Sequence, residues 1–89
     1  MFRMWVKEWK RNHILRDTVI ELPGEDRSRT QKVLAALEAA CTEFDLQPPI
    51  WLDVNIRDFQ RVAKTRFTKD AFIEEIPFDF LEIQMIEED

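Results

Sequence analysis

Apolar and polar residues alternate along the first ten positions of the chain. One side of this alternation is entirely apolar and consists of Phe2, Met4 and Val6. The other side combines tryptophan with basic residues, namely Arg3, Trp5, Lys7 and Trp9. Helical spacing fits Phe2, Val6 and Trp9 equally well, so the period alone leaves strand and helix open. Because residues 13–22 are rich in β-branched side chains and the polar KRNH before them has hairpin length, we predict an antiparallel hairpin.

A capping sequence followed by an apolar stripe predicts a helix in the middle of the chain. Ser28 and Gln31 fit a capping box, and Asp26 is the alternative cap. Apolar residues then recur three and four positions apart, at Val33, Leu37, Ala40, Cys41 and Phe44. This spacing is typical of an amphipathic helix that buries one side. The prolines at 48–49 end the helical region, since proline disfavours helical backbone in the residue before it.

A second helix of about ten residues is predicted after the short apolar link IWLD, with Asp53 as its N-cap. Its expected inward stripe is Ile56, Phe59, Val62 and Ala63. Its expected outward stripe is basic and consists of Arg57, Arg61 and Lys64, which Arg66 and Lys69 extend. Such a division between apolar and charged positions predicts a helix lying on the surface of a small core.

The sequence at residues 65–77 is compatible with two local structures, whereas the sequence after Pro77 predicts a single one. Thr68 either caps one short helical turn through Phe72 and Ile73 or belongs to an irregular, partly extended connection. Beyond Pro77, apolar Leu81, Ile83 and Met85 alternate with the residues between them, which predicts a strand. The order β-β-α-α-β predicts a single α+β domain over residues 1–89. We expect a small antiparallel sheet, built from the N-terminal hairpin and the C-terminal strand and covered by the two helices.

Three segments, PIWLD, KTRFTKDAFIEEI and FDFLEIQMIEED, resemble segments of a family of short bacterial proteins with no assigned function. The resemblance spans nearly the whole chain. It implies a small, single-domain, soluble protein and supplies no catalytic motif, cofactor or site residue.

Charge and composition narrow the classes of partner. The chain has 18 acidic and 13 basic residues and a net charge of −5, which repels polyanions and lowers the expectation of nucleic-acid binding. No apolar run reaches the length of a membrane span, and charged residues interrupt the N-terminus where a signal peptide would be apolar. We therefore predict a cytoplasmic protein without a membrane partner.

Several kinds of chemistry are disfavoured by the residues available. A single glycine excludes phosphate-binding and dinucleotide-binding loops, which need several. The only histidine, His13, and the only cysteine, Cys41, fall on different predicted elements, which argues against a zinc site. A structural role explains each candidate nucleophile or base. Ser28 caps a helix, Cys41 fills the core and His13 lies near a turn. We predict no catalytic residue, metal or cofactor, and an enzyme is the less favoured class.

Clustered acids near the C-terminus form a separate candidate site. They are Asp70, Glu74, Glu75, Asp79 and Glu82. Paired carboxylates can act as acid and base in catalysis or hold a hard cation. These acids, however, have neither the spacing of a calcium-binding loop nor a partner histidine. A solvated acidic face explains them as well. We favour the solvated face.

The first strand offers the sharpest functional choice. A sheet covered by helices on one side leaves Arg3, Trp5, Lys7 and Trp9 uncovered, and exposed tryptophans on small proteins mark interfaces. We therefore predict a non-enzymatic protein-interaction module that associates with a partner or with itself through this face. The alternative is a nucleic-acid binder that adds a basic patch of Arg57, Arg61, Lys64 and Arg66 to the same strand. The basic row also fits a solvated helix face, or one balanced by the acidic C-terminus.

Overall fold

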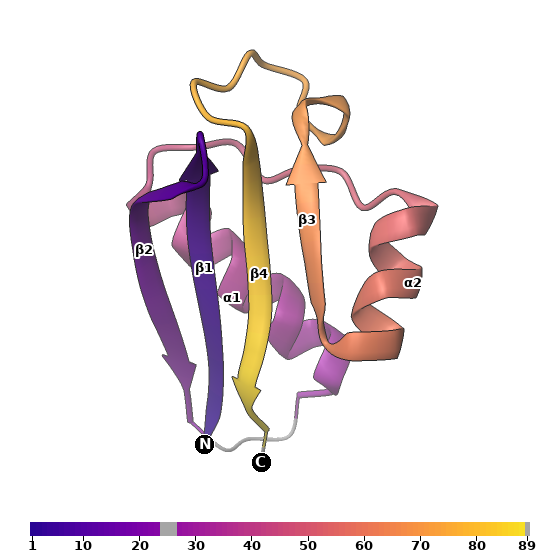
Figure 1. Ribbon diagram of the computed structural model, residues 1–89. Coiled ribbons are helices and arrows are strands. Elements are labelled where there is room, and N and C mark those ends of the chain that lie inside the picture. Colours follow the sequence, from indigo (N-terminus) through magenta and orange to yellow (C-terminus); the bar gives the residue numbers. More distant parts are fainter. Residues whose placement is uncertain (24–26, 89) are drawn as a thin grey trace.

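Four antiparallel strands form one sheet in the described part of the chain, and both helices contribute to a core on the same side of it (Figure 1). This computed structural model describes residues 1–23 and 27–88, so the alternative cap Asp26 lies outside the described residues. The elements in chain order are β1 (Phe2–Lys10), β2 (His13–Leu22), α1 (Arg29–Glu43), α2 (Asp53–Val62), β3 (Lys64–Thr68) and β4 (Phe80–Glu87). The strand order in the sheet is β2-β1-β4-β3. The predicted α+β class is confirmed.

The N-terminal hairpin forms as predicted, with a turn of only two residues. Arg11 and Asn12 have φ angles of 52° and 65°, and both lie between the paired ends of β1 and β2. Positive φ at both central positions is typical of the type I′ turn, whose twist matches that of the two strands it connects. A register shift between Glu8 and Trp9 then marks a bulge close to this turn.

Strand β3 is the element that the sequence pattern did not predict. Thr65 and Phe67 are buried while Lys64, Arg66 and Thr68 are exposed, so this short segment alternates as a strand does. It pairs with β4 at the sheet edge. Only the turn at Lys69–Ala71 is helical, as a 3₁₀ turn, and residues 72–79 have no regular structure. A short turn therefore follows Thr68, but it ends at Ala71 instead of running through Phe72 and Ile73, and the Thr68 side chain makes no capping hydrogen bond.

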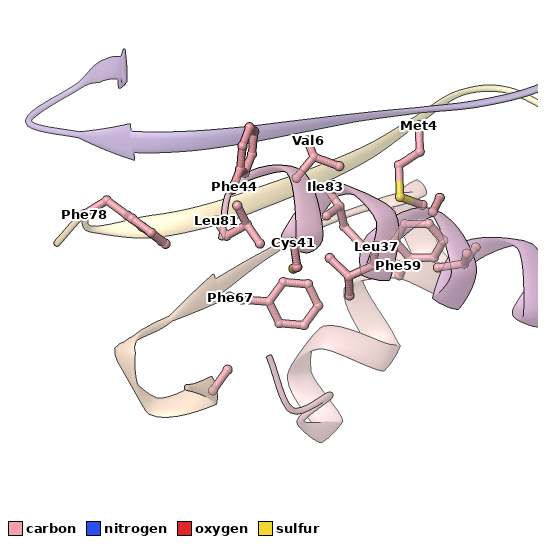
Figure 2. Packing of buried hydrophobic residues seen from close by; sticks show 14 of the residues in the cluster. Met4, Val6, Leu37, Cys41, Phe44, Phe59, Phe67, Phe78, Leu81 and Ile83 are labelled. Carbon is pink, nitrogen blue, oxygen red and sulfur yellow. The ribbon is translucent and has the colours of Figure 1, made fainter. Parts of the chain in front are cut away.

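The core lies between the helix-facing side of the sheet and the two helices (Figure 2). Phe2, Met4 and Val6 of β1 are all buried, which confirms the predicted orientation of that strand. All five residues of the predicted α1 stripe are buried as well. The capping box of α1 is also confirmed, because Gln31 N–H donates to Ser28 Oγ at 3.2 Å and Ser28 N–H donates to Gln31 Oε1 at 3.0 Å.

Helix α2 buries a different face from the one predicted. Phe59 is buried, but Ile56 and Val62 are exposed. Asn55 is buried in their place, since α2 packs beside the edge strand β3 and the Asn55 amide donates to Thr65 Oγ1 and to the Arg66 carbonyl oxygen. The prediction of an apolar stripe through Ile56 and Val62 was wrong because it rested on helical spacing, which carries no information on the packing of α2 beside β3.

The two ends of α2 also differ from the prediction. Asp53 is the first helical residue, and the cap position belongs to Leu52, whose N–H donates to Asn55 Oδ1 at 3.1 Å. The helix stops at Ala63, which has a left-handed backbone with φ of 55°. This turn moves Lys64 out of the helix and into β3, so the predicted basic stripe of α2 loses one member to the sheet.

Candidate functional site

The side of the sheet that faces away from the helices, here called the open face, carries the predicted interface residues. Arg3, Trp5, Lys7 and Trp9 of β1 all lie on this side, opposite to the buried Phe2, Met4 and Val6. In Figure 1, α1 crosses behind the strands and no helix lies in front of them. Strand pairing brings further residues to this face, notably Glu82 and Gln84 of β4 and Arg66 of β3.

An ion pair that is almost completely buried lies at the centre of the open face. Lys7 Nζ lies 2.9 Å from Glu82 Oε1, and the two side chains are only 5% and 4% exposed. Arg66 Nε donates to Glu82 Oε2 at 3.1 Å, and Trp9 Nε1 donates to Glu82 Oε1 at 3.2 Å. Lys7 also donates to Gln84 Oε1 at 3.1 Å. The carboxylate thus receives three donors, which is the arrangement that makes a buried charge tolerable.

Aromatic side chains shield this ion pair from water. Lys7 Nζ lies 3.8 Å from the centroid of the Trp5 ring, and the Arg66 guanidinium lies 4.5 Å from the centroid of Phe80. Trp9 stacks on Phe80 with ring centroids 6.1 Å apart. Each of these aromatic rings therefore has a contact within the protein itself, made by a cation or by another ring.

The surroundings of Glu82 keep it ionised. Burial by itself raises the pKa of a carboxyl group, but the hydrogen bonds from Lys7 and Arg66, the nearby Lys7 charge and the Trp9 N–H together outweigh it. The pKa of Glu82 consequently lies below its ordinary value. At neutral pH the centre of the open face holds a fixed carboxylate between two cations.

Arg3, Asp17, Glu21 and Glu87 of this face also have partners and are more exposed. Arg3 Nε lies between Glu21 at 2.9 Å and Glu87 at 3.2 Å. Trp5 Nε1 donates to Asp17 Oδ2 at 2.7 Å, which ties the indole to the edge strand β2. The predicted cations Arg3 and Lys7 are therefore both engaged by acids of neighbouring strands.

The four residues of the predicted basic patch lie on two elements. Arg57 and Arg61 are on α2, and Arg61 pairs with Asp58 at 3.6 Å. Lys64 and Arg66 are on β3, and register places them on the open face beside Gln84 and Glu82. Arg66 thus joins the interface residues predicted on β1.

The clustered acids separate in the same way. Asp70, Glu74, Glu75 and Asp79 line an open hollow of about 620 Å³ formed by the connection between β3 and β4, whereas Glu82 belongs to the open face. Asp79 Oδ2 accepts the backbone N–H of Arg11 at 2.8 Å, so it fixes the hairpin turn. Among the described residues, no group of three or more His, Cys, Asp or Glu is arranged to hold a metal ion.

Two of the three residues considered as nucleophile or base belong to α1, at its N-cap and near its C-terminal end, and the third is on β2. Ser28 caps α1, His13 is exposed at the start of β2, and Cys41 is buried in α1. Burial, followed by the negative charges of Glu8 and Glu38, raises the pKa of the Cys41 thiol to about 11. The thiol is therefore protonated at neutral pH, and a protonated thiol is a poor nucleophile.

A second buried carboxylate, which the sequence analysis did not single out, lies on the helix-facing side. Glu8 continues the alternation of Phe2, Met4 and Val6, and its buried side chain accepts from Arg16 at 2.8 and 3.1 Å. Arg16 also donates to the Phe44 carbonyl oxygen at 2.7 Å and so fastens the hairpin to the end of α1. The sequence contained one sign of this buried carboxylate, since Glu8 is a charged residue on the side of the alternation that is otherwise apolar.

No protein-family model, curated protein or solved structure compared with the chain matches it. The resemblance to short bacterial proteins therefore stays a prediction. In the part of the chain that the structure describes, no helix is long and apolar enough to cross a membrane.

Proposed function

We propose that this chain is a small protein-interaction module that associates with a second copy of itself through the open face. The observation that carries this proposal is the combination of rings and aliphatic side chains on an uncovered sheet surface. Trp5, Trp9 and Phe80 are only partly buried there, and the aliphatic residues Ile14 and Val19 of β2 are 41% and 45% exposed beside them. Aromatic residues in such a setting supply most of the energy of protein interfaces.

The size of the open face sets the expected strength of the association. Four strands spaced about 4.8 Å apart, with an average of about eight residues that each rise about 3.4 Å, present roughly 500 Å². Two copies would therefore bury about 1,000 Å², which is the lower end for specific interfaces. We expect a reversible dimer with a dissociation constant in the micromolar range.

The pairing of charges favours a protein partner over nucleic acid. Phosphate binding needs cations that are free to replace counterions, and base stacking needs free ring faces. Lys7 and Arg66 instead bind Glu82, and Lys7 also covers one face of Trp5. A protein surface of mixed charge matches this face better than a uniform polyanion does.

Sedimentation velocity over about 0.5 μM to 1 mM tests the proposal, because this range extends both below and above a micromolar dissociation constant. The wild-type protein is expected to pass from monomer to dimer. Ile14→Lys, which removes an aliphatic contact and adds a charge, should weaken association at least about tenfold. Val54→Lys is the matched control, since Val54 is 52% exposed on α2, away from the open face.

A wild-type protein that stays monomeric at about 1 mM would contradict self-association, as would an Ile14→Lys variant that dimerises normally. Fluorescence anisotropy with labelled single-stranded oligonucleotides provides the second measurement. Salt-sensitive binding that quenches tryptophan would favour the nucleic-acid alternative and count against the proposal.

A further inference from the structure

The charges of the open face alternate in sign from strand to strand. Register places four of them in one row across the sheet, in the order Asp17, Lys7, Glu82 and Arg66. The row reads acid, base, acid, base over β2, β1, β4 and β3. A second row, Glu21, Arg3 and Glu87, repeats the first three signs on the same strands. Lys64 adds another base to β3. Each strand therefore presents a single sign on this face.

We infer that two copies associate face to face about a two-fold axis that runs roughly parallel to the strands, an arrangement that rests on the proposed function. Such a rotation reverses the order of the strands and keeps positions along them, so β2 faces β3 and β1 faces β4 of the other copy. Asp17 then meets Arg66 of the partner subunit at both ends of the row, whereas Lys7 and Glu82 are 5% and 4% exposed and lie beneath the contact surface. The exposed charges of the row thus face the opposite sign, which gives electrostatic complementarity across the interface.

The alternative two-fold axis, perpendicular to the strands, gives the opposite result. That rotation lays each strand over its own copy, so acids of β2 face acids and bases of β3 face bases. Like charges brought together in this way oppose association. The parallel axis also brings Trp9 over Phe80 of the partner subunit, since the two residues are opposite each other in the register. Sheets packed face to face keep their strand directions within about 30°, which this arrangement allows.

The inferred orientation predicts two positions at which charge substitutions should compensate each other across the dimer interface. Val19 and Lys64 end the row that contains Trp5 and Gln84, and they lie on the outer strands β2 and β3. Both side chains are exposed, so substitutions there spare the core. In the inferred dimer Val19 faces Lys64 of the partner subunit. Substituting both positions therefore changes the contact between copies without breaking the Lys7–Glu82 pair.

A charge-swap experiment by sedimentation velocity tests this contact. Val19→Lys sets two lysines against each other and is expected to weaken the dimer about tenfold. Lys64→Glu sets an acid against the acidic edge of β2 and is expected to weaken it by a similar factor. The double variant Val19→Lys/Lys64→Glu pairs lysine with glutamate and should return to within about threefold of wild type. Val54→Lys/Arg57→Glu on α2 is the matched control and should dimerise normally.

The possible results separate the orientation from the proposed function. A wild-type protein that stays monomeric overturns the proposed function and the orientation with it. A wild-type dimer that is indifferent to both single substitutions overturns the orientation alone. A double variant as weak as the single variants also overturns it, because the two positions are then not in contact across the interface. Recovery in the double variant supports the parallel axis.

Discussion

Lys7 and Glu82 illustrate how a charged pair is held on a face that no helix covers. Taking both charges out of water is costly, and their mutual attraction offsets that cost only when the remaining hydrogen bonds are made. Glu82 has Arg66 and Trp9 as further donors, and Lys7 has Gln84 as a further acceptor. The pair therefore contributes to a defined geometry of the open face. Removing one partner is expected to lower the free energy of unfolding by more than the intact pair raises it.

Replacing Glu82 with glutamine leaves Lys7 buried without an anion. We expect the free energy of unfolding to fall by about 3–5 kcal/mol, measured by urea denaturation. Glu87→Gln, which alters an exposed pair with Arg3, should cost less than about 1 kcal/mol. The double variant Lys7→Met/Glu82→Leu should regain most of the loss, because no buried unpaired charge remains and Arg66, which also loses Glu82, is 60% exposed. A Glu82→Gln protein as stable as Glu87→Gln would contradict this account.

The same residue predicts a pH dependence. Because the pKa of Glu82 is lower in the folded protein than its ordinary value of 4.5, the stabilisation is complete above that value. It is lost as the pH falls through the lower folded pKa, where the carboxylate becomes protonated. The difference in unfolding free energy between wild type and Glu82→Gln should thus be constant at neutral pH and shrink in acid. A difference that grows in acid would contradict the lowered pKa.

At the residue scale, sequence periodicity predicted the β1 side of the open face but not the partners of its residues. The alternation separates Trp5 and Trp9 from Phe2, Met4 and Val6 without any tertiary information. The contact between Lys7 and Glu82 joins residues 75 positions apart and depends on β1 lying next to β4. A sequence pattern carries no register between distant strands, so the burial of Lys7 could not be predicted from it.

At the element scale, the end of α2 decides where the basic residues lie. Ala63 adopts φ of 55°, a left-handed conformation that favours glycine because any Cβ crowds the following carbonyl. The cap N–H still donates to the Phe59 carbonyl oxygen at 2.9 Å, and the chain turns directly into β3. The helix predicted from the sequence has about ten residues and includes Lys64, and neither glycine nor proline marks the earlier stop at Ala63.

Ala63→Gly is therefore expected to stabilise the protein. Removing the Cβ relieves the left-handed backbone, and part of that gain is offset by the greater freedom of glycine in the unfolded chain. We expect a net gain of about 0.5–1 kcal/mol in urea denaturation. Ala39→Gly is the control, because Ala39 is exposed within α1 and the same substitution there should cost about 1 kcal/mol. Destabilisation by both substitutions would contradict the assigned role of Ala63.

The elements themselves were predictable to different degrees for physical reasons. α1 has both a capping box and an apolar stripe, so local and tertiary preferences agree. β3 has five residues, two of them buried, and its first residue, Lys64, continues the helical spacing of Arg57 and Arg61. Its identity as a strand comes from pairing with β4, a contact that forms only once the connection at residues 69–79 has closed.

At the scale of the whole molecule, self-association makes stability depend on protein concentration. A dimer of folded chains is favoured by mass action, so each tenfold rise in concentration above the dissociation constant should add about 0.7 kcal/mol of unfolding free energy per chain. Urea midpoints measured at about 1, 10 and 100 μM should therefore rise in the wild-type protein. Ile14→Lys should show a smaller dependence over the same range, while Val54→Lys keeps that of the wild type.

Salt distinguishes an interface of matched charges from one held by apolar contacts alone. Raising the ionic strength to about 1 M shortens the screening length to about 3 Å, which weakens the exposed contacts between Asp17 and Arg66 of the partner subunit. Apolar contacts of Trp9 and Ile14 are not screened in this way. The concentration dependence of the urea midpoint should consequently shrink in sodium chloride. A dependence that salt leaves unchanged or increases would assign the association to the aromatic and aliphatic side chains and remove the electrostatic basis for the parallel axis.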